Sequence, residues 1–400
     1  MTLPSVLRPW WRLFKRLHRL VTLLCGVLFR ALSPLLAERG VPRSAAATSA
    51  ETAAREPAAV RLHPGRTPEL LTRPAPHGEP AEHHAFARNR SVTVPATFTL
   101  EVSDGRLTGD FGATTTPGKV LDHETSTYFG VTDWREHPIF LRPTLGPTEQ
   151  VRGTVLSLTA RGAGYNYYHF VFDSIARFGV FEDCLPGEHV DAIVVPHRTR
   201  YQRELLELAG ITGRFIEPAR GRTIRADRLL VPSNPNWALD APPSMVAWLR
   251  ARLRPTGTAE TPRRLYLTRG DVPRTRRYVH EAQLWPELER RGFLRLDPGQ
   301  FSVQEQIDIF SRAEVVVSPH GAALTNVVFS DPSVRVLELF ASTYVHLGLW
   351  SICQSLGASY RYLVDDQPFD RGNRNAGVFD DVHVPAARVL AAVDEMLSRP

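Results

Sequence analysis

Lysine and cysteine are both scarce in this chain of 400 residues. Lys15 and Lys119 are the only lysines, so the formal net charge of +6 comes almost wholly from arginine. We give this bias little functional weight by itself, although the planar guanidinium suits anionic ligands such as phosphate. The three cysteines lie far apart and form no CxxC pair. That spacing argues against a disulfide scaffold or a structural zinc site, and favours a reducing compartment.

Familiar nucleotide-binding and metal motifs are also missing. The segment GAGYNY (162–167) lacks the last glycine of GxGxxG, and neither GxxxxGK[ST] nor HExxH occurs. These absences exclude the standard dinucleotide fingerprint, the P-loop and the zinc-protease helix. Hydrophobic residues make up 43% of the chain and charged residues 22%, which fits a globular protein of two domains with extensions.

The first 43 residues predict a basic N-terminal segment. Five cationic side chains precede the apolar run LVTLLCGVLF, which has about half of the roughly 20 residues needed to cross a bilayer. We favour a basic amphipathic helix on an anionic membrane surface, and hence a cytoplasmic protein attached peripherally to the membrane. Two alternatives stay open: an exported protein whose signal is cleaved near the AAA at 45–47, and a disordered basic tail.

Residues 44–90 are rich in Ala, Pro, Arg, Glu and His without periodicity, which predicts a mostly disordered linker. From there the chain is expected to form an N-terminal domain over 91–254, a C-terminal domain over 255–365, and a tail with a closing helix over 366–400. Continuously apolar strand segments alternate with helical segments from 151 onward, which indicates parallel sheets covered on both faces. The predicted fold class is therefore α/β, with two Rossmann-like domains facing a cleft.

A polar stripe interrupts the apolar helix predicted for NYYHFVFDSIARF (166–178). Asn166, His169, Asp173 and Arg177 are spaced by three, four and four residues, which places them on one face. An acid and a base at i and i+4 can bond to each other and adjust each other's pKa. The stripe is either a satisfied polar network at a domain interface or a catalytic group.

A second feature is VVVSPHGAALTNVVF (315–329), where a buried strand runs into a predicted helix of small residues. Backbone N–H groups at a helix start attract anions, and Gly321, Ala322 and Ala323 leave room for a phosphate beside His320. The alternative is a tight turn whose small residues serve packing. Such a turn lies at the carboxyl end of a strand, where α/β sheets bind ligands.

Arginines follow the neighbouring strand RRLYLTR. Arg269 ends that strand, and Arg274, Arg276 and Arg277 precede the next helix, as a diphosphate clamp would require. A solvated basic loop is the alternative for some of them. Glu338 lies inside a predicted buried strand and should therefore have a partner, either a ligand hydroxyl or a structural arginine.

Together, NYYHFVFDS, YLTR with RRYVHE, FSVQEQIDIFSRAEVVVSPHGAALTNVVF and VLEL resemble glycosyltransferase family 61. The resemblance covers about residues 151–365, and HGAALTN is its most specific part. It implies a GT-B fold and inverting transfer from a nucleotide sugar, with no essential metal and no cofactor; the absence of DxD agrees with this. The positions that it implies for the donor site are Arg269, Arg277, Gly321, Ala322, Asn326 and Glu338.

The resemblance also favours a catalytic role for the stripe. Inverting transfer needs one base to deprotonate the acceptor hydroxyl, and we expect Asp173 in this role, with His169 as the rival and Asn166 orienting a sugar or the imidazole. The expected function is glycosyl transfer in bacterial cell-surface polysaccharide synthesis, with a nucleotide-sugar donor, a glycan or lipid-linked glycan acceptor, and no nucleic acid partner. A catalytically silent nucleotide-sugar or glycan-binding scaffold is the alternative.

Overall fold

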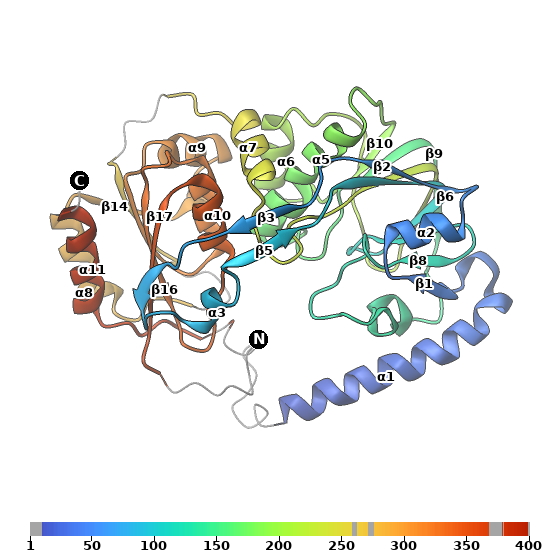
Figure 1. Cartoon of the computed structure of the whole chain (residues 1–400), viewed down its shortest axis with the longest axis horizontal. Coiled ribbons are helices and arrows are strands. Elements are labelled where there is room, and N and C mark those ends of the chain that lie inside the picture. Colours follow the sequence, from blue (N-terminus) through green and yellow to red (C-terminus); the bar gives the residue numbers. More distant parts are fainter. Residues whose placement is uncertain (1–9, 258–261, 271–275, 368–377, 379, 399–400) are drawn as a thin grey trace. The chain divides into compact units, whose positions relative to one another are not determined.

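The computed structural model describes residues 10–257, 262–270, 276–367, 378 and 380–398 (Figure 1). The chain divides into two compact units. The N-terminal unit comprises Leu13–Glu69 and Val94–Ala238, and the C-terminal unit contains Leu70–Thr93 and Leu239–Pro400. The division near residue 239 precedes the expected boundary at 254, because α7 (Pro243–Arg252) packs against helices of the C-terminal unit.

The C-terminal unit is built on a six-stranded sheet in which all neighbouring strands are parallel, in the order β14-β13-β15-β16-β17-β4. Its strands are β4 (His77–Glu79), β13 (Arg264–Leu267), β14 (Phe293–Leu296), β15 (Val315–Pro319), β16 (Arg335–Phe340) and β17 (Ser359–Val364). Its helices α8 (Glu281–Arg290) and α11 (Ala386–Ser398) lie on one side, and α9 (Val303–Ser311) and α10 (Gly348–Leu356) on the other (Figure 1). Both faces are covered, which explains why these strands are continuously apolar.

The S-x-x-E motif of Ser302 and Glu305 is a capping box, and it starts α9. Ser302 accepts a hydrogen bond from the backbone of Glu305, and the Glu305 carboxylate accepts one in return from the Ser302 N–H at 2.7 Å. The apolar positions that follow are buried, with Val303, Ile307 and Phe310 fully enclosed. Packing of this face against the 3-10 helix η7 (Ala322–Phe329) fixes the loop that follows β15.

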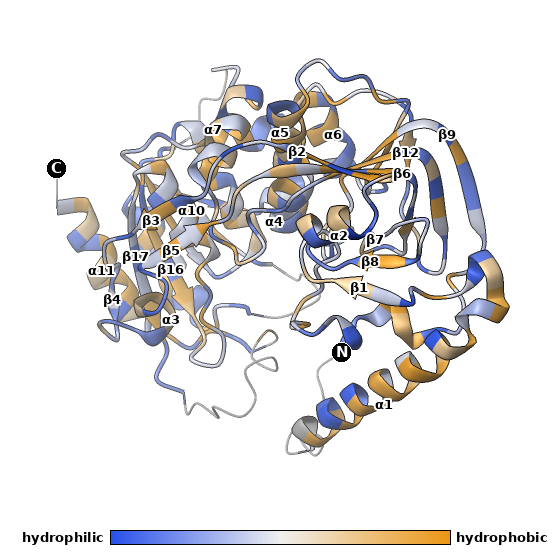
Figure 2. Ribbon diagram, turned by 45° about the vertical axis from the view of Figure 1, so that its right-hand side comes forward, coloured by the Kyte–Doolittle hydropathy of each residue, from blue (hydrophilic) through white to orange (hydrophobic). Residues whose placement is uncertain are grey.

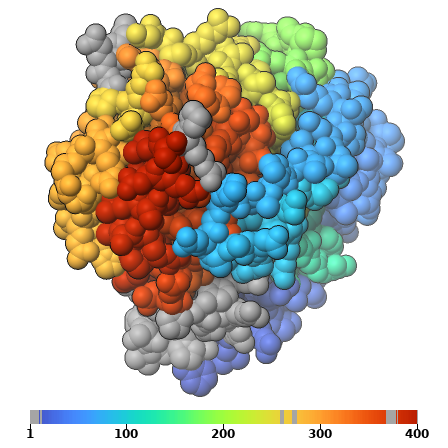
Figure 3. Space-filling view, turned by 60° about the vertical axis from the view of Figure 1, so that its left-hand side comes forward, coloured from blue at the N-terminus to red at the C-terminus, as the bar shows by residue number. Residues whose placement is uncertain are grey.

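The prediction of a disordered linker over residues 44–90 is wrong, and its second half belongs to the C-terminal unit. There, β4 pairs with β17, and the short helix α3 (His84–Ala87) inserts Phe86 among Tyr362, Trp350 and Tyr360. Figure 3 shows this blue segment packed against the red and orange C-terminal elements. Arg73 is also buried and pairs with Asp240 at 3.1 Å. Single buried residues such as Phe86 anchor the segment without any periodicity, so composition gave no sign of them.

The first half of the same stretch belongs to the N-terminal unit. It forms β1 (Ser44–Ala46), α2 (Ser49–Arg55) and β2 (Val60–Pro64). β1 pairs in parallel with β8 (Val120–Asp122), and β2 pairs with β6 (Phe98–Thr108). Two hydroxyls of α2, from Ser49 and Thr52, donate to the buried carboxylate of Asp122 at 2.9 and 2.5 Å. Strand β3 (Glu69–Thr72) pairs with β5 (Ser91–Val94) in a separate two-stranded sheet, and most of both strands falls in the C-terminal unit.

The N-terminal unit has a nine-stranded mixed sheet in the order β1-β8-β7-β6-β12-β9-β10-β11, with β2 on β6. Strands β9 (Thr148–Ser157), β10 (Ala192–Val194), β11 (Phe215–Ile216) and β12 (Thr223–Pro232) are mutually parallel, whereas β6 and β7 (Ala113–Thr115) pair antiparallel. The chain is thus a mixed α/β protein with parallel strands, compatible with a Rossmann-like fold.

Helix α1 (Trp11–Leu32) extends beyond the apolar run LVTLLCGVLF at both ends. By length and composition alone, Leu13–Arg39 is the one segment among the described residues that could cross a membrane. The prediction that the apolar run is too short therefore does not hold for the helix as a whole. Figure 2 shows α1 coloured largely as hydrophobic.

Candidate functional site

The polar stripe lies on a helix that is not regular. Asn166 caps α4 (Tyr167–Phe170), where its side-chain oxygen accepts a hydrogen bond from the backbone N–H of His169 at 3.4 Å. One π-helical turn, Val171–Ile175, follows and carries Asp173; α5 (Ala176–Cys184) then continues the helix. Such π-turns are rare and recur at functional sites. Asn166 thus orients the helix that carries His169.

His169 and Asp173 form a hydrogen-bonded pair, with 2.7 Å between Nδ1 and Oδ2. Asn236, a residue that the sequence analysis missed, donates from Nδ2 to the other carboxylate oxygen of Asp173 at 2.8 Å. Tyr168 in turn donates its hydroxyl to Asn236 Oδ1 at 3.2 Å. Both oxygens of Asp173 are therefore occupied, whereas Nε2 of His169 has no hydrogen bond to any residue that the structure describes.

Packing holds the imidazole in place. The ring of Phe129 lies 4.8 Å from that of His169, measured between centroids. Gly162 has φ +98, and a Cβ there would come within 2.9 Å of His169 Cδ2, so only glycine fits the backbone at this close approach. The glycine in GAGYNY therefore shapes the wall of the histidine site.

Asp173 lies at the wall of a cavity of about 510 Å³ within the N-terminal unit. The rim carries exposed aromatic side chains, Trp237 at 64% and Phe129 at 50%, and Arg161 and Glu124 also line it. Aromatic and polar side chains around a partly enclosed volume are typical of a small-molecule site. Asp173 therefore borders a ligand-sized volume, and His169 lies next to it through the hydrogen bond to Asp173.

Arg177, the last member of the stripe, is structural. It is 2% exposed and donates to the main-chain carbonyl oxygens of Pro232 and Thr159, the latter at 3.1 Å. Burial lowers the pKa of this guanidinium to about 10, so it remains charged at neutral pH. It ties the helix to the last residue of β12 and to the segment that follows β9, so it belongs to a buried polar network within the N-terminal unit.

A second cluster lies in the C-terminal unit, where the parallel strands β13, β15 and β16 reach their carboxyl ends. Arg269, two residues beyond β13, donates from Nη1 to the carbonyl oxygen of His320, just beyond β15, at 3.1 Å. Arg276 lies with its guanidinium carbon 5.5 Å from the ring centroid of Tyr344, and the His320 ring is 5.5 Å from that same ring. This carboxyl edge is where parallel α/β sheets bind ligands.

His320 is held by Glu338, with 2.6 Å between Nδ1 and Oε1, and Tyr360 donates to the other oxygen of Glu338 at 2.6 Å. Glu338 is fully buried, and burial raises the pKa of its carboxyl to about 8. Burial and the nearby Arg276 and Arg269 lower the pKa of His320. The partner of Glu338 is thus neither a ligand hydroxyl nor an arginine, and a protonated Glu338 with a neutral His320 fits these contacts.

The neighbouring arginines differ in what they contact. Arg277 is turned toward Asp381, whose carboxylate accepts from the Arg277 backbone N–H at 2.8 Å and lies 3.4 Å from Nη2. Arg274 lies outside the described residues. Arg276 rather than Arg277 accompanies Arg269, and the sequence could not separate them because they are adjacent.

The small residues after β15 are arranged differently from the prediction. Gly321 is extended, with φ −175, and η7 is a 3-10 helix rather than an α-helix. A Cβ at Gly321 would meet the guanidinium of Arg269, so the glycine makes room for that arginine. Ala322 and Ala323 are half-buried beside it, whereas Asn326 is fully buried and donates to Gln306 Oε1 at 2.8 Å. Asn326 therefore packs η7 against α9.

Comparison with known proteins identifies the region that carries both clusters. Residues 167–337, less than half of the chain, match the family model described as Glycosyltransferase 61. This match confirms the resemblance predicted from the sequence motifs, and the segment includes His169, Asp173, Arg269 and His320. No curated protein matches the chain. The family supports glycosyltransferase activity, and hence a sugar donor and an acceptor as substrates.

Proposed function

We propose that this member of glycosyltransferase family 61 is an inverting, metal-independent transferase that moves a sugar from a nucleotide-sugar donor to a glycan acceptor. The observation that carries the proposal is that Asp173 lies at the wall of a ligand-sized cavity and is hydrogen-bonded to His169. Asn236 fixes the second carboxylate oxygen, so the pair is oriented from both sides. A binding protein has no need of an oriented acid–base pair.

The contacts favour His169 as the base, in place of Asp173, which the sequence favoured. Asp173 accepts hydrogen bonds at both oxygens and can hold the proton of His169 on Nδ1. Nε2 then carries the lone pair, an arrangement in which a carboxylate sets the tautomer and stabilises the imidazolium that forms.

In the proposed step, the oxygen of an acceptor hydroxyl attacks the anomeric carbon of the donor from the side opposite the leaving group. The hydroxyl proton passes to Nε2 of His169. The bond between the anomeric carbon and the phosphate oxygen breaks, and the nucleoside diphosphate leaves with that electron pair. The proton later returns to solvent, which restores the base.

We propose that the donor diphosphate binds beside Arg269 and Arg276. Support comes from their position at the carboxyl edge of the parallel sheet and from the neutral state of His320, which leaves the two guanidinium groups as the positive charges there. Charge-assisted hydrogen bonds from guanidinium to phosphate would stabilise the leaving group. The GT-B arrangement of the two units and a role in bacterial cell-surface polysaccharide synthesis belong to the same proposal.

The experiment is incubation of the full chain with a panel of nucleotide sugars and oligosaccharides, followed by NMR of the glycoside that forms. The proposal predicts one preferred donor, with a product whose anomeric configuration is opposite to that of the donor. Retention of configuration would contradict the single-base mechanism. Activity that disappears with a chelator and returns with a divalent cation would contradict metal independence.

A further inference from the structure

Arg161 lies between two cavities of the N-terminal unit and has an unusual environment. Its guanidinium carbon is 4.9 Å from the ring centroid of Tyr128, 5.4 Å from that of Tyr165 and 5.8 Å from that of Phe129. Among the described residues it has neither an ion pair nor a hydrogen bond, and its Nε is buried without a partner. A charged group held by aromatic rings alone still lacks an anion.

Arg161 contributes to the lining of both cavities. On one side is the volume of about 510 Å³ that contains Asp173. On the other is a cavity of about 280 Å³, whose charged lining consists of Arg161, Arg142, Arg220 and Asp110. Arg220 lies 3.7 Å from Asp110, whereas Arg142 has no ion pair among the described residues. The second cavity therefore has an excess of positive charge.

The same short helix lines the second cavity and contacts α1. Pro138, Ile139 and Leu141 of the 3-10 helix η4 (Pro138–Leu141) line the cavity. The remaining residue of η4, Phe140, packs on α1, where its Cβ is 3.5 Å from the position of a Cβ on Gly26. Arg30 of α1 lies 5.2 Å from the Phe140 ring and 5.0 Å from that of Trp134. One short element thus separates the basic cavity from α1.

Helix α1 packs against the N-terminal unit through a few residues of its second half and leaves most of its large apolar side chains exposed. Thr22 and Gly26 are buried, and Arg19 pairs with Glu136 at 2.6 Å. One exposed stripe follows a spacing of four, three, four and three residues, with every side chain between 53% and 62% exposed; its members are Leu13, Leu17, Leu20, Leu24 and Val27. An apolar stripe of this length facing solvent fits a lipid surface, and the exposed cations Lys15 and Arg16 near its start suit anionic headgroups.

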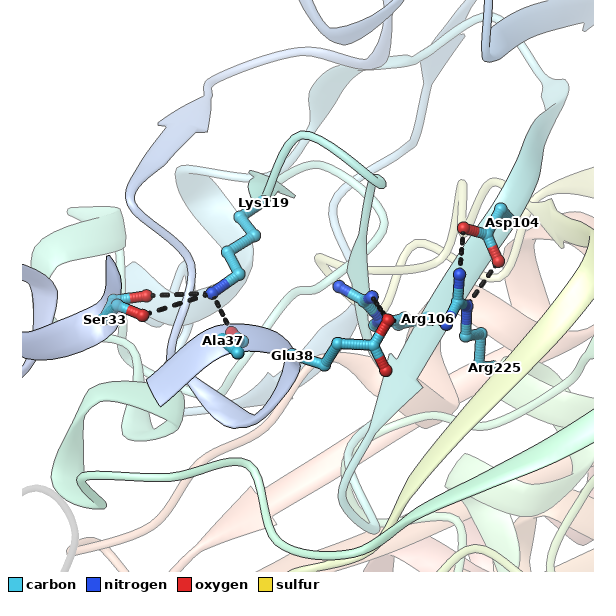
Figure 4. A network of polar contacts seen from close by, with 7 residues as sticks. All are labelled: Ser33, Ala37, Glu38, Asp104, Arg106, Lys119 and Arg225. Atoms are coloured by element: carbon cyan, nitrogen blue, oxygen red, sulfur yellow. Dashed lines mark hydrogen bonds and ion pairs between the residues drawn. The ribbon is translucent and has the colours of Figure 1, made fainter. Parts of the chain in front are cut away.

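The 3-10 helix η2 (Ser33–Arg39), which directly follows α1, is tied to the N-terminal unit, and this favours a helix α1 that lies in the plane of the membrane. Lys119 donates to the backbone and hydroxyl oxygens of Ser33, at 3.4 and 3.3 Å, and also to Ala37 (Figure 4). Arg225 pairs with Asp104 and bonds to Glu38 at 2.7 Å. A spanning position would break these contacts and place Arg30 in the hydrocarbon, at a cost of roughly 2.5–3.5 kcal/mol.

Cleavage of the segment as a signal is also disfavoured. The AAA at 45–47 overlaps β1, which pairs with β8, and Ala46 is fully buried. Cutting there would remove a strand from the sheet of the N-terminal unit.

From these observations we propose that the acceptor is a membrane lipid carrying a sugar through a phosphate group. Its lipid chain lies in the bilayer with the stripe of α1, its phosphate binds Arg161 and Arg142, and its sugar reaches the cavity that contains Asp173. This inference rests on the proposed function for the transfer step, but its binding claim can be tested without any donor.

The test uses phosphatidylcholine vesicles that contain a sugar joined to a long alkyl chain through a diphosphate, with the matching uncharged alkyl glycoside as control. The full chain should bind the charged vesicles at least about tenfold more tightly, as one charge-assisted hydrogen bond would give. Arg161→Ala should remove that preference and Arg161→Lys should keep part of it, whereas Arg152→Ala, an exposed arginine on β9, should change nothing. Equal binding of the two vesicle types, or an unchanged preference in Arg161→Ala, would overturn the proposal. So would displacement by inorganic phosphate at the concentration at which the charged probe binds.

The membrane contact has its own control. Leu17→Glu combined with Leu24→Glu should abolish vesicle binding, whereas Leu70→Glu, at a position 67% exposed outside α1, should leave it intact. Release of the wild type by alkaline carbonate supports a helix in the membrane plane, and retention would overturn it. A wild-type dimer that the α1 variant dissociates, with no vesicle binding, would show that a second copy covers the stripe instead. If the vesicle results hold but no nucleotide sugar is consumed, the proposed function fails and only the lipid-binding part of this inference stands. If the protein transfers sugar to free oligosaccharides but shows no preference for the charged vesicles, the proposed function stands and this inference fails.

Discussion

The imidazole of His169 and the carboxylate of Asp173 meet at 2.7 Å across a turn that is widened into a π-helix. Asn236 holds the far oxygen of Asp173 at 2.8 Å, so the acid cannot turn away from the imidazole without losing a buried hydrogen bond. In the proposed mechanism the two residues therefore have different roles: Asp173 positions the imidazole, and His169 exchanges the proton.

The positioning role predicts the effect of Asp173→Asn. Loss of the negative charge should destabilise the imidazolium and lower the transfer rate by about 10²–10⁴-fold. Donor affinity should stay within about twofold, because Asp173 lies in the N-terminal unit and the donor cluster in the C-terminal one. Initial rates and donor titration measure the two effects. Asp227→Asn is the matched control, since among the described residues Asp227 accepts hydrogen bonds only from Gln150 and the Gly153 N–H. A wild-type rate in Asp173→Asn would remove this role.

The proposed diphosphate site predicts that the adjacent residues Arg276 and Arg277 differ in their contribution to diphosphate binding. Arg269→Ala and Arg276→Ala should each weaken nucleoside diphosphate binding by about 10–150-fold, which corresponds to the 1.5–3 kcal/mol of a charged hydrogen bond. Arg277→Ala should have little effect, because that side chain pairs with Asp381. Isothermal titration with the diphosphate alone measures all three. If Arg277→Ala lost the most diphosphate affinity, the donor site would include Arg277, as the family resemblance implies, and the contact geometry would not identify it.

Glu338 and His320 predict how stability depends on pH. The pKa of Glu338 is raised from 4.5 to about 8, so the folded state keeps a proton that the unfolded chain releases above pH 4.5. The pKa of His320 is lowered from 6.5, so below that pH the unfolded chain binds a proton that the folded state excludes. Between pH 4.5 and 6.5 the two effects oppose each other. From pH 6.5 to about 8 the opposing contribution of His320 fades while that of Glu338 persists, so the two groups together should lower the free energy of unfolding by at most about 1.4 kcal/mol per pH unit.

Glu338→Gln tests this account. The amide can still donate to His320 and accept from Tyr360, but it does not titrate. Thermal unfolding at pH 6.5, 7.25 and 8 should therefore show a falling midpoint in the wild type and a flatter one in the variant. An identical slope in both proteins would mean that another group causes the dependence.

The burial of Phe86 predicts that residues 70–93 stabilise the C-terminal unit. Phe86 is 1% exposed and its ring lies 4.5 Å from that of Tyr362, so Phe86→Ala should lower the free energy of unfolding by about 3–5 kcal/mol. Leu70→Ala, at an exposed position of the same stretch, should change it by about 0.5 kcal/mol or less. Urea unfolding measures both. Equal free energies of unfolding for the two variants would show that the segment does not stabilise the unit and is a linker.

The parts of this structure that the sequence predicted are those set by short-range patterns. The capping box of Ser302 and Glu305 begins α9, and the apolar runs at 315–319 and 335–339 lie in parallel strands. His169 and Asp173 could be paired from their spacing alone. Asn236 could not, because it reaches Asp173 from 63 positions further along the chain.

Other features depend on contacts that leave no periodic signal. Residues 44–90 are ordered by single insertions such as Phe86 and by strand pairing with distant segments. The different directions of Arg276 and Arg277 follow from a positive φ at Arg276 and from Asp381, more than 100 residues away. Neither contact can be read from local composition.

The most direct test of the central claim is release of nucleoside diphosphate from a nucleotide-sugar panel by the wild type and by His169→Ala, with donor binding measured on the same samples. The account predicts that the wild type turns over at least one donor, and that His169→Ala binds this donor normally but releases diphosphate at least about 100-fold more slowly. Binding without turnover of every donor by the wild type would identify a binding protein instead, and full turnover by His169→Ala would contradict His169 as the base.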